Sequence, residues 1–175
     1  NQFDEKLLFS KESLDYLKLY TGNNTMIRLE HNVRNTPQIV KALEVVSKAR
    51  VGEAKVRGDG PDVTRVDFEQ FIDEITSQNN IEIDQTGILY VNSSDLDQIS
   101  IKDKLIDDGC DFCQINRFKG LESNYVFVIG LGSVDSTESF RDLYYKSVSR
   151  STGACFIVDN ENVRAHLKEL RNAKS

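Results

Sequence analysis

The sequence predicts an α/β fold with three layers, in which a mostly parallel sheet carries helices on both faces. Short apolar runs, of which Tyr125–Ile129 is the strongest, have the composition of strands that are buried on both sides. Segments with apolar residues at helical spacing separate these runs, and this alternation is typical of parallel sheets. A chain of 175 residues with 39% hydrophobic residues can bury the core of one domain. We therefore interpret residues 1–175 as a single domain.

Strands are expected where short apolar runs lie between turn-forming residues. In chain order, these runs cover residues 26–29, 63–66, 87–91, 112–115, 125–129 and 155–158. A polar, glycine-containing loop is expected over residues 52–61.

Helices are expected between these strands, and several have a recognisable first residue. Thr36 can cap a helix that begins with Pro37, because the missing N–H of proline costs nothing at that position. Asp67 and Gln70 have the spacing of a capping box, and Asn160 can cap the last helix. In chain order, helices are expected over residues 10–20, from 37 through 46, from 68 through 75, over 96–106 with a break near 100, over 139–148 and from 161 through 170.

The composition limits the kinds of protein that this chain can be. The formal net charge is −6, so the surface as a whole repels nucleic acid. Nucleic-acid binding would therefore need a local patch, or a cleft shared with another domain. No signal peptide or long apolar run is present, which indicates a cytoplasmic protein without a membrane partner. Because the chain begins with Asn1 rather than methionine, we expect it to be a piece of a longer protein.

The three cysteines are Cys110, Cys113 and Cys155, and this small odd number argues against a disulfide framework. Cys110 and Cys113 form a C-x-x-C sequence, which would suit a redox pair or one half of a zinc site. A structural zinc ion needs four ligands, however, and the two histidines are far away in the sequence and unpaired. We interpret the cysteines as packing residues and expect no metal site.

Three polar loops contain the residues on which a functional hypothesis can be built. They cover residues 31–37, 114–122 and 144–151. Ligands of parallel sheets bind beyond the carboxyl ends of the strands, so we expect the three loops at that edge of the sheet. Taken singly, their charged residues have ordinary explanations, such as a surface ion pair or a cation at a helix C-terminus. The order and spacing of the three loops carry the hypothesis.

The three loops and their flanking strands resemble motifs of the UvrD/Rep branch of superfamily 1 helicases. The segment HNVRNTPQIV is similar to motif IV, INRFKGLESNYVFVIGL to motif V, and DLYYKSVSRSTGACFIV to motif VI. The resemblance extends from residue 26 to about residue 158. It implies the second RecA-like domain of a helicase motor, a P-loop NTPase-like domain that lacks the P-loop. No G-x-x-x-x-G-K-[ST] sequence occurs in the chain. ATP and Mg²⁺ would therefore be held mainly by an N-terminal RecA-like domain of the same protein.

The resemblance also assigns roles to individual residues. Arg34 and Arg150 match the arginines that reach the γ-phosphate in the family, where arginine fingers stabilise the transition state. Gly120 and Glu122 match the motif V positions that face the nucleotide, the glutamate accepting from the ribose. Val33 stands where the family usually has a tyrosine that stacks on adenine.

A second set of motif V residues is implied to bind nucleic acid. Gln114, Asn116 and Arg117 match the side of the motif that contacts single-stranded DNA in relatives, and RNA remains an alternative. The sequence therefore favours an ATP-dependent helicase that is active as part of the full-length protein, with this piece inactive by itself.

Two other interpretations stay open at this point. Gly130-Leu131-Gly132 follows the strongest strand and begins a dinucleotide-binding fingerprint, but Asp135 replaces the third glycine. A non-catalytic RecA-like module that binds a partner protein would fit the acidic surface. Such a module would have no need of Arg34, Glu122 and Arg150.

Overall fold

A sheet of five parallel strands forms the centre of the protein. The computed structural model describes residues 31–48, 51–54, 58–77, 81–117 and 122–172. Across the sheet the strands follow the order β3-β7-β6-β4-β5, and every neighbouring pair is parallel. The strands are β3 (Thr64–Val66), β4 (Thr86–Tyr90), β5 (Asp111–Gln114), β6 (Ser123–Ile129) and β7 (Ser151–Val158). The structure thus confirms the predicted α/β class.

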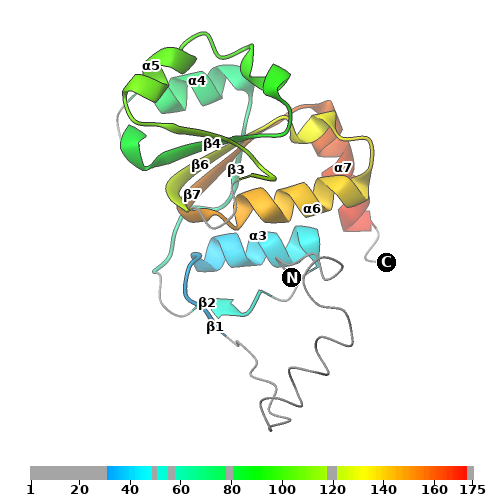
Figure 1. Cartoon of the computed structure of the whole chain (residues 1–175). Coiled ribbons are helices and arrows are strands. Elements are labelled where there is room, and N and C mark those ends of the chain that lie inside the picture. Colours follow the sequence, from blue (N-terminus) through cyan, green and yellow to red (C-terminus); the bar gives the residue numbers. More distant parts are fainter. Residues whose placement is uncertain (1–30, 49–50, 55–57, 78–80, 118–121, 173–175) are drawn as a thin grey trace, which may run out of the picture. The chain divides into compact units, whose positions relative to one another are not determined.

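Helices cover both faces of this sheet (Figure 1). One face packs against α3 (Pro37–Ser47), α6 (Thr137–Val148) and α7 (Glu161–Asn172). The other packs against α4 (Phe68–Thr76) and α5 (Lys102–Asp107). Successive residues of β6 enter opposite cores, Val126 and Val128 on the α6 side and Phe127 and Ile129 on the α4 side. This is why the central strands are continuous apolar runs rather than alternating ones.

Two helices, α3 and α4, begin at the residues that the sequence indicated, whereas α6 begins at Thr137, two residues before the expected start. The Thr36 side chain accepts from the Ile39 N–H, and Pro37 opens α3. The capping box before α4 is complete, since the Asp67 carboxylate accepts from the Gln70 N–H at 2.8 Å and the Gln70 amide accepts from the Asp67 N–H at 3.1 Å. Caps of this kind satisfy backbone donors that have no partner inside the helix.

Asn160 caps the last helix as predicted, with its side-chain oxygen 3.0 Å from the Val163 nitrogen. Only the second half of the helix expected over 96–106 forms, as α5, and the first half is wrong, because residue 96 ends the 3₁₀ turn η2 (Ser93–Leu96) and residues 97–101 are not helical. Two more 3₁₀ turns, η1 (Ile83–Gln85) and η3 (Leu131–Ser133), lie before β4 and after β6.

A small second sheet differs from the expectation. β1 (His31–Asn32) and β2 (Glu53–Ala54) pair in parallel, so part of the segment interpreted as a loop over 52–61 is a strand. Two residues give too short a pattern for a strand to be recognised from sequence. The helix expected over 10–20 and the strand expected over 26–29 lie outside the described residues, as does the part of the single-domain interpretation that concerns residues 1–30.

Both central strands begin earlier than the apolar runs suggested. β6 starts at Ser123 and β7 at Ser151, and these two residues are partners in the ladder. Polar residues therefore begin both strands, so their apolar runs alone could not mark the start. This pairing matters for the site, because it places the residues that precede the two strands next to each other.

Among the described residues, no helix has both the length and the apolar character needed to cross a bilayer.

Candidate functional site

Two of the predicted site residues lie side by side where the sheet begins. Glu122 directly precedes β6 and Arg150 directly precedes β7, and the Ser123 N–H donates to the Arg150 carbonyl at 3.1 Å. We call this end of the sheet, where the strands start, the amino edge. The expectation that the loops lie at the carboxyl ends of the strands was therefore wrong for Glu122 and Arg150. The segments containing them lead into strands, and only residues that follow a strand reach the other edge.

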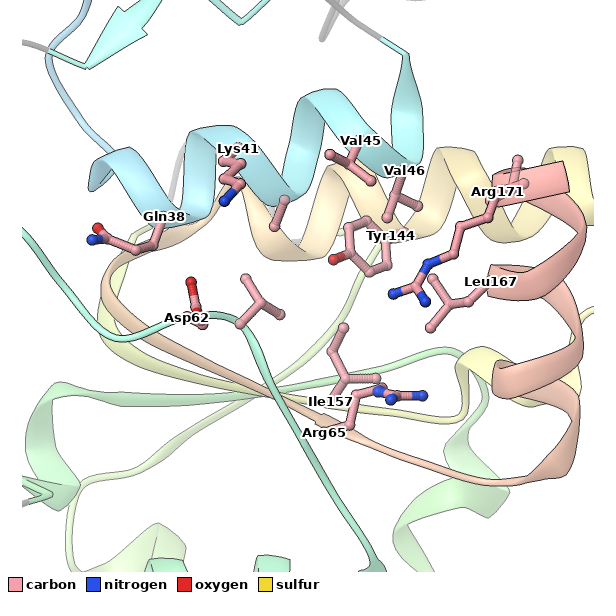
Figure 2. Close-up of a pocket in the computed structure, with 13 residues that line it drawn as sticks. Gln38, Lys41, Val45, Val46, Asp62, Arg65, Tyr144, Ile157, Leu167 and Arg171 are labelled. Carbon is pink, nitrogen blue, oxygen red and sulfur yellow. The ribbon is translucent and has the colours of Figure 1, made fainter. Parts of the chain in front are cut away.

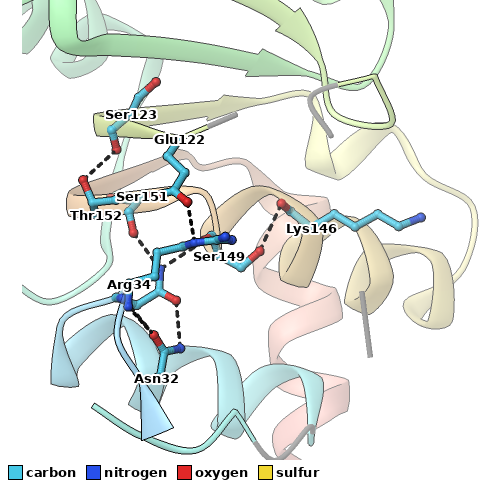
Figure 3. A network of polar contacts seen from close by, with 9 residues as sticks. Asn32, Arg34, Glu122, Ser123, Lys146, Ser149, Ser151 and Thr152 are labelled. Atoms are coloured by element: carbon cyan, nitrogen blue, oxygen red, sulfur yellow. Dashed lines mark hydrogen bonds and ion pairs between the residues drawn. The ribbon is translucent and has the colours of Figure 1, made fainter. Parts of the chain in front are cut away.

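Arg34 joins the same site from the loop before α3. Its Nε lies 2.7 Å from the Glu122 carboxylate oxygen, and both side chains are about one third exposed (33% and 39%). Figure 3 shows Arg34 reaching from the α3 segment to Glu122 beside the Ser149–Ser151 turn. The residues of loops far apart in the sequence thus meet, and we call Arg34, Glu122 and Arg150 the amino-edge cluster.

Arg150 is the most buried member of the amino-edge cluster, with 7% of the residue exposed. Burial is the main cause that lowers the pKa of its guanidinium, and the positive charge of Arg34 lowers it further, while Glu122 opposes both effects. Arginine remains protonated at neutral pH despite such shifts. Among the described residues, none forms an ion pair with the Arg150 side chain. The cluster therefore holds two cations against one carboxylate, with one cation largely removed from water.

A buried asparagine joins the two arginine-bearing loops. Asn35 is 2% exposed, and its side-chain amide donates to the Ser149 carbonyl at 3.1 Å and to the Ser151 carbonyl at 2.7 Å. These two carbonyls flank Arg150. Because Asn35 also follows Arg34 directly, one side chain fixes the loop of one arginine to the backbone of the other.

Asn32 holds that asparagine in place. Its side-chain oxygen accepts from the Arg34 and Asn35 N–H groups, both at 2.9 Å, and its amide donates to the Asn35 side-chain oxygen at 3.0 Å (Figure 3). This is the local turn that asparagine forms readily. We call Asn32 and Asn35 the asparagine clip. The sequence analysis gave neither residue a role, although two asparagines on either side of an arginine in a loop were a usable signal.

Tyr145 is a second neighbour that the sequence analysis missed. It lies on α6 and is half-buried, and burial raises the pKa of its hydroxyl, while the positive charges of Arg150 and Arg34 partly oppose that rise. Both arginines are therefore within electrostatic reach of this hydroxyl. Arg150 lies beyond the end of α6, five positions after Tyr145, so no helical spacing in the sequence indicated this proximity.

The residues expected to bind nucleic acid lie in and after β5. Gln114 ends that strand, level with Tyr90 at the end of β4, so it stands at the carboxyl edge of the sheet. Its amide donates to the Val91 carbonyl at 2.9 Å, so the side chain links the end of β5 to the residue that follows β4. Asn116 accepts from the Lys146 ammonium at 3.4 Å, and both Asn116 and Arg117 are exposed. Of the three, Arg117 and Asn116 are the more available to a ligand.

The remaining predicted nucleotide-facing residues are less informative. Val33 is 62% exposed, in the loop that also presents Arg34. Gly120 lies outside the described residues, so its predicted role remains a prediction.

The dinucleotide-binding interpretation does not fit the loop after β6. Gly130 has a φ of 83°, a left-handed conformation that glycine adopts readily, and it leads into the 3₁₀ turn η3. The next α-helix begins only at Thr137. A dinucleotide fingerprint needs a helix N-terminus directly after its glycines, where the pyrophosphate binds.

The cysteines are unpaired, and two of them are buried. Burial raises the pKa of Cys110 and of Cys155 to about 12 in each case, so both stay as neutral thiols. The described residues contain no group of three or more histidine, cysteine or acidic side chains that could hold a metal ion.

The parallel five-stranded sheet with helices on both faces is a RecA-like fold. The sequence matches no protein-family model and none of the curated proteins. Its fold is similar to a solved structure, the C-terminal domain of a possible DNA helicase from Lactobacillus plantarum WCFS1. The TM-score is 0.57 at 21% sequence identity, with 81% of this chain and 96% of that chain covered. At that identity the similarity establishes the fold alone.

Proposed function

We propose that this chain is the second RecA-like domain of an ATP-dependent DNA helicase of superfamily 1, of the UvrD/Rep type. The observation that carries the proposal is the amino-edge cluster, in which Arg34 and Arg150 meet at Glu122. The three residues come from segments that resemble motifs IV, V and VI. The structurally similar protein, the C-terminal domain of a possible DNA helicase, supports the same class of protein.

The chemistry of the cluster suits a triphosphate. ATP hydrolysis moves the γ-phosphoryl group to water, with charge spread over its oxygens in the transition state. Guanidinium groups are planar, permanently charged and able to donate two hydrogen bonds to one phosphate, so two of them at one point stabilise that charge. Arg150 is held in place and desolvated, which strengthens its interaction with an anion. In our proposal Arg34 and Arg150 are the catalytic arginines.

The ion pair between Arg34 and Glu122 has a role in the same scheme. Without a nucleotide, the carboxylate neutralises part of the positive charge that Arg34 brings to the cluster. When ATP binds, Glu122 would accept from the ribose and Arg34 would turn to the γ-phosphate. The ion pair is therefore expected to break during each catalytic cycle. Because both side chains are partly exposed to solvent, breaking it costs little free energy.

The chain supplies only part of the nucleotide site. The P-loop and the Mg²⁺ carboxylates are expected in an N-terminal RecA-like domain of the same protein, with the amino-edge cluster facing it. Single-stranded DNA would bind along the segment that contains Asn116 and Arg117, with RNA as an alternative substrate.

The test is an ATPase assay of the complete protein with and without single-stranded DNA, together with calorimetry of this chain and ATP. We expect DNA to stimulate hydrolysis by the complete protein, and we expect no micromolar ATP binding by this chain alone. A complete protein that neither hydrolyses ATP nor responds to DNA would instead favour the non-catalytic, partner-binding module. Micromolar ATP binding by this chain would contradict the proposed division between two domains.

A further inference from the structure

A pocket of about 280 Å³ lies on the α3–α6–α7 side of the sheet, next to the outer strand β3. Figure 2 shows side chains from α3, α6, α7, β7 and the β3 segment facing it. Its wall is largely apolar and includes Val46, Ile157 and Leu167. None of the residues of the amino-edge cluster lines it, so it is separate from the proposed nucleotide site.

The hydroxyl group of a largely buried tyrosine faces this pocket. Tyr144 is 4% exposed and is one of the lining residues. No described residue forms a hydrogen bond with its hydroxyl, and burial raises the pKa of that group, which keeps it a proton donor. Among the described side-chain oxygens and nitrogens, Asp159 Oδ1 is the one that is fully buried without a partner, so the Tyr144 hydroxyl keeps an opening to the pocket. A ligand or water there can supply its acceptor. The pocket therefore offers a donor without an acceptor.

Three cationic side chains surround the same space. Lys41 comes from α3, Arg65 from β3 and Arg171 from α7. Arg65 and Arg171 are both close enough to the Tyr144 hydroxyl to lower its pKa against the effect of burial. Such a concentration of positive charge is unusual in a chain whose net charge is −6.

Few carboxylates balance these cations. Asp62 is the one acidic residue among the described lining residues. The Arg65 guanidinium lies 3.8 Å from Asp159, which also accepts from Arg164. Lys41 and Arg171 form no ion pair with a described residue. Two arginines directed at one apolar pocket leave an unbalanced positive charge, and an anion would balance it.

We propose that this pocket binds a small organic anion, with a carboxylate or phosphate group held by Arg65, Arg171 and the Tyr144 hydroxyl. Its apolar body, about the size of one ring, rests against Val46 and Leu167. Sites for small molecules commonly combine an apolar wall with a few polar groups that fix the head group. The proposal goes beyond the proposed helicase function and does not depend on it.

The test is a titration of this chain followed by NMR chemical shifts, with benzoate and phenyl phosphate as probes. Benzyl alcohol carries the ring without charge, and acetate carries the charge without the ring. We expect saturable shifts around Tyr144 with at least one anionic ring compound, at a dissociation constant on the order of 1 mM or tighter. Both control compounds are expected to bind at least about tenfold more weakly. The probe that binds more tightly shows whether the pocket prefers a carboxylate or a phosphate group.

Variants separate this site from general charge attraction. Arg171→Ala should weaken binding of the better probe about tenfold, and Tyr144→Phe should weaken it several-fold without changing the packed ring. Lys168→Ala removes an exposed cation of the same helix that does not line the pocket, and should leave binding unchanged. Shifts that stay linear up to about 20 mM, far above the expected constant, would overturn the proposal. So would equal losses in Arg171→Ala and Lys168→Ala.

Discussion

The two ends of the central sheet differ in how their polar residues are held. At the amino edge, Arg150 and Asn35 are buried, and the two loops that carry arginines are joined by direct hydrogen bonds. Towards the carboxyl edge, Asn116 and Arg117 are exposed, and the one hydrogen bond that the Asn116 side chain forms with a described residue is long, at 3.4 Å. One end is thus preorganised and the other is adaptable. A triphosphate in a transition state is stabilised by fixed charges. A single strand of nucleic acid that moves along a protein needs contacts that can break and form again.

The largest effect is expected from the arginines of the amino-edge cluster. If the proposed function is correct, Arg150→Ala or Arg34→Ala in the complete protein should lower ATP turnover by about 10³-fold or more, since arginine fingers contribute this much in related systems. The Michaelis constant for ATP should change far less. Steady-state ATPase kinetics measure both. Arg164→Ala is the control, because this exposed arginine follows β7 instead of preceding it. Turnover near the wild-type value in Arg150→Ala would remove that residue from the site.

The asparagine clip should give the next largest effect. Asn35→Ala leaves two carbonyls beside Arg150 without their donor, which should cost about 1–3 kcal/mol of stability in this chain, measured by urea unfolding. In the complete protein, the misplaced arginine should lower ATP turnover about 10²-fold.

A double variant tests whether Asn35 acts through Arg150. Adding Asn35→Ala to Arg150→Ala should cause little further loss of turnover, because residues that act as a unit are not additive. Asn162→Ala is a matched control, since its amide also donates to a backbone carbonyl, that of Gly132 at the far end of the sheet. Additive losses in the double variant would show that Asn35 supports only the fold.

Substitutions near the carboxyl edge of the sheet are expected to have smaller effects, and the effect on nucleic-acid binding should depend on salt. Arg117→Ala should weaken the proposed binding of single-stranded DNA by the complete protein and reduce the slope of log K against log salt by about 0.7. Gln114→Ala should instead reduce stability by about 1 kcal/mol, because its amide is bonded to the Val91 carbonyl. Fluorescence anisotropy at several salt concentrations and urea unfolding distinguish the two outcomes. An unchanged slope in Arg117→Ala would contradict a phosphate contact at this residue.

The smallest effect is expected at Val33. Valine has no aromatic face and makes no polar contact that separates adenine from guanine, so the complete wild-type protein should discriminate poorly between ATP and GTP. Stacking adds roughly 0.5–1.5 kcal/mol, so Val33→Tyr should lower the Michaelis constant for ATP several-fold. Hydrolysis rates with both nucleotides measure this. A strong preference for ATP in the wild type, unchanged in the variant, would show that Val33 is not near the base.

The sequence was sufficient for the architecture because its signals are local. The proline after Thr36, the spacing of Asp67 and Gln70, and the apolar run in β6 each depend on neighbouring residues. The sequence did not predict the pairing of β1 with β2, because a strand of two residues is too short to show an alternating pattern. It also did not predict the starts of β6 and β7, because the first residues of both strands are serines.

The sequence indicated which loops meet, but not at which edge of the sheet. The resemblance to helicase motifs grouped Arg34, Glu122 and Arg150, which the structure brings together. Their edge of the sheet depends on whether a loop enters or leaves a strand. The asparagine clip could not be derived, because Asn35 and Ser151 are separated by 116 positions. Contacts between residues so far apart in the sequence depend on the packing of α3 against the sheet, and no local sequence pattern indicates them.

The outer strands of the sheet have a consequence for self-association. β3 and β5 are the edges, and they contain three and four residues respectively. Each edge exposes only a short row of free backbone groups, and β3 also carries the exposed side chain of Arg65 at its middle residue. Short, charged edge strands are poor templates for adding strands from another molecule. The longest apolar strands, β6 and β7, lie in the interior of the sheet, where they cannot seed aggregates while the fold is intact.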